Sequence, residues 1–106
     1  MDNDLKAEVL RQLGIGKDKA LTGNLLKQRL GLKDTRPIRL AIIDLIVDDG
    51  IPIVSNDKGY FLAQTPEECK EALKKLRAYG VMLFRHYKYL KLAAQKKFSG
   101  QMSMRL

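Results

Sequence analysis

The chain has 106 residues, of which 45% are hydrophobic and 30% charged, which is enough for one modest folded domain. That length leaves little room for both a substrate cleft and a complete catalytic shell, and a single cysteine, Cys69, cannot form an internal disulfide. No apolar stretch approaches the length of a membrane-spanning helix, and the acidic, amphipathic start MDNDLKAEVL does not resemble a signal peptide, so a cytoplasmic protein is predicted.

The net charge of +8 is carried entirely by the last third of the chain. Residues 1–69 contain ten Lys and Arg against eleven Asp and Glu, a sum of −1. Residues 70–106 contain ten basic residues against Glu71 alone, a sum of +9. This asymmetry indicates a polyanionic partner, nucleic acid first and an anionic membrane surface second, although a solvated lysine-rich helix has the same composition.

Two helices are predicted in the first third of the chain. Apolar residues at helical spacing predict a helix over residues 4–13, closed by the glycine-containing residues 14–16. After a connector over residues 17–21, Thr22 caps a short predicted helix that ends at Gly31.

The third predicted helix begins at Thr35, carries Pro37 in its first turn and stops at Gly50. It has two apolar faces. The expected core face consists of Ile38, Ala41, Ile42, Leu45 and Ile46. The second face consists of Leu40, Ile43 and Val47. Because a helix that is apolar nearly all round is usually buried, we expect the long C-terminal helix, of the same chain or of a partner, to cover the second face.

Residues 51–62 predict a β-hairpin, with strands over residues 51–54 and 60–63 and a turn that ends at Gly59. An isolated hairpin is at best marginally stable in water, so we expect it to pack against the helices before it. Thr65, Pro66 and Glu68 then form a predicted capping box.

The capping box opens a long helix that runs to about Phe98, with Gly80 as a possible kink or close crossing point. Steps of four and three residues along it give the seam of a coiled coil. The seam consists of Cys69, Leu73, Leu76, Gly80, Leu83, Tyr87, Leu90 and Ala94. A homodimer through Leu76, Leu83, Tyr87 and Leu90 is one prediction. Packing of the helix onto its own domain, with a frayed basic end, is the other.

The predicted chain is therefore mainly α-helical with a small β-hairpin, and its second and third helices form a helix-turn-helix. We expect a domain over residues 1–64, a basic C-terminal helix over residues 65–98 and a loose tail over residues 99–106.

Three stretches resemble the winged helix-turn-helix family: Leu25–Leu32, Asp49–Ile53 and Asp57–Leu62. They are similar to the N-terminal DNA-binding domain of the biotin repressor. The sequence Gly-Tyr-Phe-Leu-Ala followed by Thr-Pro-Glu-Glu also resembles small winged-helix proteins encoded by bacteriophages and prophages. The similarity covers about residues 3–64 and does not extend to the repressor's biotin-ligase domain, so it implies no ligase activity.

The resemblance implies that the third helix enters the major groove while the hairpin, or wing, contacts the backbone or minor groove. Carried over residue by residue, the implied DNA contacts are Lys33, Thr35, Arg36, Arg39, Asn56 and Lys58. The alternative is that these are solvated surface residues. The second apolar face and the carboxylates of Asp44, Asp48 and Asp49 count against DNA contact along the rest of that helix.

The end of the long helix is basic and aromatic. Its residues are Arg85, Lys88, Lys91, Lys96 and Lys97, interleaved with Tyr87, Tyr89 and Phe98. We predict further DNA contacts by Arg85, Lys88 and Lys91. Contact with a membrane surface, or lysines that simply keep an apolar seam soluble, would give the same pattern.

Catalysis is not predicted. His86 and Cys69, each the only residue of its type, are 17 positions apart on one predicted helix, about 25 Å at helical rise. They cannot form a nucleophile pair or a zinc site within one chain, and no phosphate-binding glycine loop is present, so neither a metal nor a cofactor is predicted.

The sequence thus predicts a protein that binds double-stranded DNA as a dimer, as a small transcriptional regulator or as a phage replication or packaging accessory. The alternative is a winged-helix module that binds a protein partner through Leu40, Ile43 and Val47 and does not contact DNA.

Overall fold

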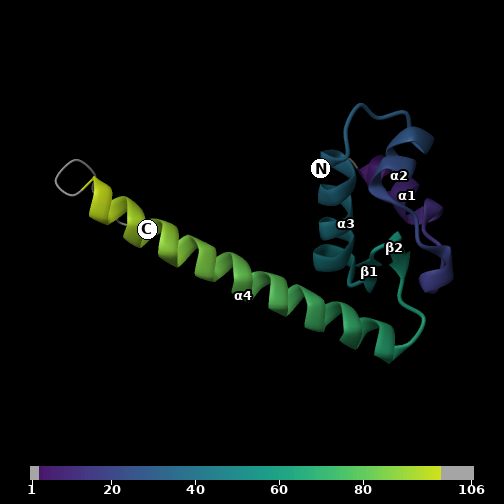
Figure 1. Ribbon diagram of the computed structural model, residues 1–106. Coiled ribbons are helices and arrows are strands. Elements are labelled where there is room, and N and C mark those ends of the chain that lie inside the picture. Colours follow the sequence, from purple (N-terminus) through teal and green to yellow (C-terminus); the bar gives the residue numbers. More distant parts are fainter. Residues whose placement is uncertain (1–2, 99–106) are drawn as a thin grey trace. The chain divides into compact units, whose positions relative to one another are not determined.

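The computed structural model describes residues 3–98, which form a mainly helical chain with one small β-hairpin (Figure 1). The predicted tail over residues 99–106 lies outside the described residues. The chain divides into two compact units, Met1–Ala72 and Leu73–Leu106. The elements are α1 (Asn3–Gln12), η1 (Lys17–Lys19), α2 (Gly23–Arg29), α3 (Arg36–Asp49), β1 (Ile53–Asn56), β2 (Gly59–Leu62) and α4 (Pro66–Lys97).

The ends of α2 and α3 are set by local chemistry. The hydroxyl oxygen of Thr22 accepts a hydrogen bond of 3.1 Å from the backbone N–H of Leu25, which confirms the predicted N-cap of α2. At the far end of α3, Gly50 adopts a left-handed conformation with φ of 67°, and its N–H bonds to the carbonyl of Ile46. The predicted stop at Gly50 is therefore confirmed.

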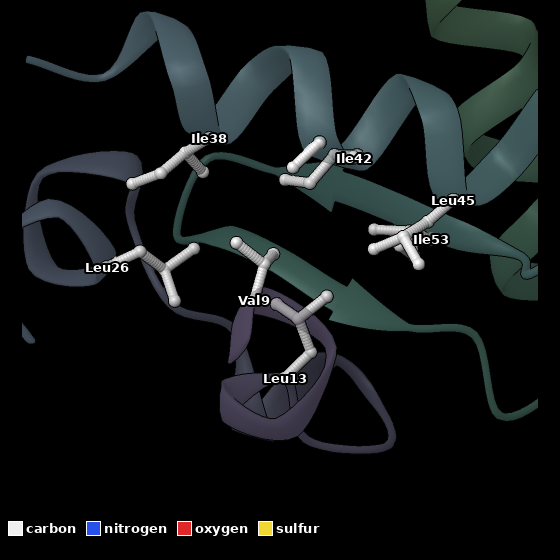
Figure 2. Packing of buried hydrophobic residues seen from close by; sticks show 8 residues of the cluster. Val9, Leu13, Leu26, Ile38, Ile42, Leu45 and Ile53 are labelled. Atoms are coloured by element: carbon white, nitrogen blue, oxygen red, sulfur yellow. The ribbon is translucent and has the colours of Figure 1, made fainter. Parts of the chain in front are cut away.

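The core of the N-terminal unit lies between the three helices and the hairpin (Figure 2). It consists of Val9, Leu13, Leu26, Ile38, Ala41, Ile42, Leu45 and Ile53. Burial of each large side chain in this cluster contributes about 1.5–3 kcal/mol. The expected core face of α3 is correct for four of its five members. The prediction that Ile46 belongs to the core face is wrong, because its side chain is 42% exposed and lies outside the cluster.

The hairpin has a shorter loop than predicted, because β1 lies two residues later than the predicted first strand and β2 one residue earlier than the predicted second strand. Strands β1 and β2 pair antiparallel with Ile53 opposite Leu62 and Asn56 opposite Gly59, so Ser55 and Asn56 belong to a strand and not to the turn. The loop is left with two residues, Asp57 and Lys58. The side-chain oxygen of Asn56 accepts a 2.8 Å hydrogen bond from the N–H of Lys58, which holds this tight turn.

The connector after α1 stabilises the hairpin. The backbone of Leu21 exchanges two hydrogen bonds with Tyr60, of 2.9 and 2.8 Å, and the backbones of Gly14 and Gly16 each bond to Leu62 at 2.8 Å. Residues 14–21, which include the short helix η1, therefore pair with the edge of β2 that β1 leaves open. This arrangement, which the sequence did not predict, explains how a two-stranded sheet persists in so small a unit.

Helix α4 begins with the predicted cap, used in a modified way. The N–H of Glu68 donates to the hydroxyl of Thr65 at 3.2 Å, as in a capping box. The carboxylate of Glu68 instead accepts hydrogen bonds from the backbone N–H groups of Gln64, at 2.6 Å, and of Lys17, at 3.2 Å. It therefore ties the start of α4 to η1. The bond from Gln64, with that from Lys17, holds the pKa of Glu68 below its ordinary value.

Helix α4 is continuous over all of its 32 residues, about 48 Å at 1.5 Å per residue. It runs through Gly80 without interruption, and apart from the adjacent residues and the backbone of α4 itself, no atom of residues 3–98 lies within 4 Å of the position that a Cβ would take there. None of the helices within residues 3–98 has the length and apolar character needed to span a membrane.

Candidate nucleic-acid interface

The outward face of α3 begins with two arginines. Residues buried on α3 recur at positions 38, 41, 42 and 45, which leaves Arg36 and Arg39 on the opposite side, and both side chains are exposed. Neither guanidinium takes part in an ion pair within the described part of the chain. They are one turn apart, so both can meet the same extended anion.

The backbone at the start of α3 is already partly capped. The carboxylate of Asp34 accepts a 3.0 Å hydrogen bond from the N–H of Arg36, and Pro37 has no N–H. The hydroxyl of Thr35 caps nothing. Because Asp34 supplies an anion at this helix end, the positive charge available to a phosphate resides in the arginine side chains more than in the helix dipole.

The hairpin loop lies at the same end of the unit as these arginines. In Figure 2 the turn between the two strands lies on the side of Leu26 and Ile38, away from Leu45. Two close approaches at the start of α2 agree with this. A side chain at Gly23 would lie 3.6 Å from the methyl of Thr35 and 3.8 Å from the ring of Tyr60. One at Gly59 would lie 2.6 Å from the backbone nitrogen of Thr22.

The N-terminal unit therefore brings together most of the DNA contacts that the resemblance implies. Arg36 and the half-buried Thr35 lie at the start of α3, beside the start of α2, and the exposed Lys58 lies in the loop that approaches the same segment. Lys33 is exposed in the turn before α3. Asn56 is half-buried, and its side-chain oxygen is engaged in holding the loop.

The other half of the α3 surface is apolar. Leu40 is 41% exposed, Ile43 52% and Val47 72%, and Ile46 adds to them. The covering that we expected over the first three is not provided by any element of the N-terminal unit. Exposed apolar side chains in this number on one helix indicate a surface that binds something.

The acidic end of α3 is partly neutralised. Lys6 of α1 lies 3.2 Å from the carboxylate of Asp49 and 4.0 Å from that of Asp48. Its own side chain is largely buried, with 14% exposed, so the two carboxylates share a cation held by the packing of α1 against α3. Repulsion of phosphate by this end of the helix is therefore weaker than the sequence suggested.

Apart from Lys70, the basic residues of α4 belong to the second compact unit. Arg85 and Lys88 are exposed, with the amine of Lys88 6.0 Å from the centre of the Tyr89 ring, and Lys91 is half-buried. The side chains of the predicted dimer seam are exposed as well. They are Leu76, Leu83, Tyr87 and Leu90.

Sequence reasoning missed the junction that assembles the interface. The start of β2 meets the Leu21–Thr22 segment, and both the start of β2 and the residue before α3 lie against Gly23 of α2. The available signal was the pair of glycines at positions 23 and 59, because glycine permits close backbone approach. Comparison of the chain with protein-family models, with curated proteins and with solved structures gave no match. The functional argument therefore depends on the geometry of this surface.

Proposed function

We propose that the protein binds double-stranded DNA as a winged-helix protein, with α3 as the recognition helix and the hairpin as the wing. The observation that carries the proposal is the position of Arg36 and Arg39, exposed on the outward face at the start of α3, at the end of the unit where the Lys58 loop also lies. A cationic helix end beside a cationic hairpin loop suits a major groove and the backbone next to it.

Each group has a distinct role in this proposal. Arg39, one turn into α3, is long enough to donate two hydrogen bonds to a guanine edge. Arg36, Lys33 and Lys58 contact phosphates, which fixes the orientation of the protein on the duplex without reading sequence. Asn56 holds the wing in shape through its bond to the Lys58 N–H. The basic residues of α4 add phosphate contacts.

The biological role that we infer is a small transcriptional regulator, or an accessory in phage replication or packaging, acting in the cytoplasm. A dimer would present two recognition helices to a pseudo-palindromic site.

Paired substitutions test the proposal. Arg36→Ala with Arg39→Ala should weaken binding to a mixed-sequence duplex at low salt by at least about tenfold, because two cationic contacts are lost. Arg11→Ala with Arg29→Ala removes the same charge from exposed positions on α1 and α2 and should change the affinity less than about twofold. Fluorescence anisotropy measures the affinity, and circular dichroism checks that each variant is folded. Equal effects of the two pairs would contradict the proposal.

A second function is favoured by the exposed apolar side chains of α3. In this alternative, Leu40, Ile43 and Val47 bind a protein partner and DNA is not contacted. Ile43→Asp separates the two, because Ile43 lies outside the core. If partner binding is the function, a folded Ile43→Asp protein loses its partner, and neither it nor the unsubstituted protein binds the duplex. If DNA binding is the function, the unsubstituted protein binds the duplex.

A further inference from the structure

Residues 73–98, the described part of the second compact unit, contain no buried core. Beyond Ala72, the described part of α4 packs against no other element of that unit, and its large apolar side chains are exposed. A lone helix of this length is only marginally stable in water, because most helix stability in proteins comes from packing of an apolar face. The helix therefore requires a partner surface along its length.

The spacing of the apolar side chains indicates the kind of surface. Written as a heptad, with apolar positions labelled a and d, the helix has leucine at three successive d positions, seven residues apart. These d residues are Leu76, Leu83 and Leu90. The a residues are Leu73, Gly80, Tyr87 and Ala94. A repeat of 3.5 residues is the pattern of a left-handed coiled coil between helices, and leucine at d is typical of two strands.

The residues that flank the seam determine its orientation. Those on one side, at position e, are Lys70, Arg77, Phe84 and Lys91. Those on the other side, at position g, are Ala72, Tyr79, His86 and Ala93. One flank is thus mostly cationic, and the other carries no lysine, arginine or carboxylate.

Parallel and antiparallel pairs bring different flanks together. In a parallel pair the e row of one helix meets the g row of its partner, which sets Arg77 beside an alanine and Phe84 beside the ring of a second Tyr79. In an antiparallel pair the e row of one helix meets the e row of the other. Depending on the register, this sets Lys70 opposite Lys91 or sets Arg77 opposite another cationic side chain. Like charges in contact are destabilising, so the charge pattern selects the parallel orientation.

We propose that a second copy of the chain covers this seam, as a parallel, in-register two-stranded coiled coil from Leu73 to Ala94. Matching copies place each of the three leucine layers against itself. The remaining basic residues, at positions b, c and f, stay on the outside of the pair. They include Lys74, Arg85, Lys88 and Lys96. The pairing does not depend on DNA binding.

Disulfide trapping tests both the pairing and its orientation. In a Cys69→Ala background, Leu90→Cys places a thiol at a d position, and Leu92→Cys places one two residues further on, at f. Leu90 and Leu92 form a matched pair, because both side chains are exposed in the single chain, 62% and 50% respectively. With the proteins at low micromolar concentration under a mild oxidant, we expect the Leu90→Cys protein to form a covalent dimer on a non-reducing gel at least tenfold faster than the Leu92→Cys protein.

Analytical ultracentrifugation of the Cys69→Ala parent accompanies the trapping and should give the mass of a dimer. A monomeric parent would overturn the proposal, as would equal trapping of the two cysteine variants. A dimeric parent in which neither Leu73→Cys nor Leu90→Cys alone is trapped, while the double variant Leu73→Cys with Leu90→Cys is, would overturn the parallel orientation, because position 73 meets position 90 only in antiparallel helices. No DNA is present, so a failure here is distinct from a failure of the proposed function.

Discussion

At the scale of single residues, two glycines with positive φ show how backbone approach shapes the interface. Gly59 has φ of 125°, and a side chain there would overlap the carbonyl group of Leu21. Gly31 has φ of 66°, and apart from its two chain neighbours no atom of the described residues lies within 4 Å of the position that a Cβ would take there. The first glycine is required by both conformation and space, and the second by conformation alone.

These two glycines give a matched pair of variants. Gly59→Ala should lower the free energy of unfolding by about 3 kcal/mol or more, because it adds a clash with the Leu21 backbone to the strain of positive φ. Gly31→Ala should lower the free energy of unfolding by about 1–2 kcal/mol, because it adds only the strain of an alanine at positive φ. Urea denaturation followed by circular dichroism measures both. Equal costs would show that the hairpin loop does not approach Leu21 as closely as the structure has it.

The carboxylate of Glu68 joins the start of α4 to η1. Since its pKa is lowered on folding, the ionised form is favoured in the folded state. Its contribution to stability is present at pH values above the ordinary pKa of glutamate, about 4.3, and is lost as the pH falls through the lower folded-state value.

We therefore expect Glu68→Gln to destabilise the protein at pH 7 and to do so less as the pH falls below about 4. Urea denaturation at pH 7 and at a pH below about 4 measures the free energy of unfolding of the variant and of the unsubstituted protein. Glu67→Gln, an exposed neighbour in the same turn, controls for loss of a charge at the helix start. A destabilisation by Glu68→Gln that is equal at both pH values would contradict the assignment.

At the scale of elements, α3 presents a core face and an exposed apolar face on one helix. Ile38 is fully buried in the cluster, and Ile43 is 52% exposed. Because both residues are isoleucines on one helix, the same substitution changes helix propensity equally at the two positions. Any difference in the free energy of unfolding between the two variants therefore reports burial.

Truncation of these isoleucines should have unequal costs. Ile38→Ala should lower the free energy of unfolding by about 2–5 kcal/mol, because it removes buried methyl groups and leaves a cavity. Ile43→Ala should change it by less than about 0.5 kcal/mol. Chemical denaturation at one pH compares the two. If Ile43→Ala cost as much as Ile38→Ala, the exposed face of α3 would have to be buried in solution.

The elements that local chemistry defines could be predicted to within a residue or two. The Thr22 cap, the Pro37 start and the Gly50 stop depend only on neighbouring residues, and they bound α2 and α3 as expected. The pairing of residues 14–21 with β2, the shorter hairpin loop and the exposure of Ile46 depend on packing between distant segments. The period of the apolar residues predicts on which face of a helix a side chain lies. It does not predict how much of that side chain a neighbouring element covers.

The same division holds for the candidate interface. The exposure of Arg36 and Arg39 follows from the period of the buried residues on α3, so the sequence was sufficient to place them outward. That the hairpin loop approaches the start of α2, at the end of α3 that carries Arg36, follows from the tertiary contacts of Gly59 and Gly23.

At the scale of the whole molecule, the excess of positive charge and the candidate interface lie in different units. Lys70 and Glu71 cancel, so the unit ending at Ala72 has a net charge of −1 and residues 73–106 carry +9. On the proposed function, α4 supplies most of the sequence-independent attraction to a duplex, and Arg36 and Arg39 supply orientation and readout. Loss of the arginines should then weaken binding without abolishing it.

The most direct measurement is the affinity of the full chain for a mixed-sequence DNA duplex across a series of salt concentrations. The account predicts binding at low salt that weakens as salt rises, with log K falling by about 0.9 per unit of log salt for each phosphate neutralised. For Arg36→Ala with Arg39→Ala the slope should be shallower by about 1, because Arg36 is the phosphate contact of the pair. Absence of binding at 50 mM salt, or an affinity that salt does not change, would contradict it.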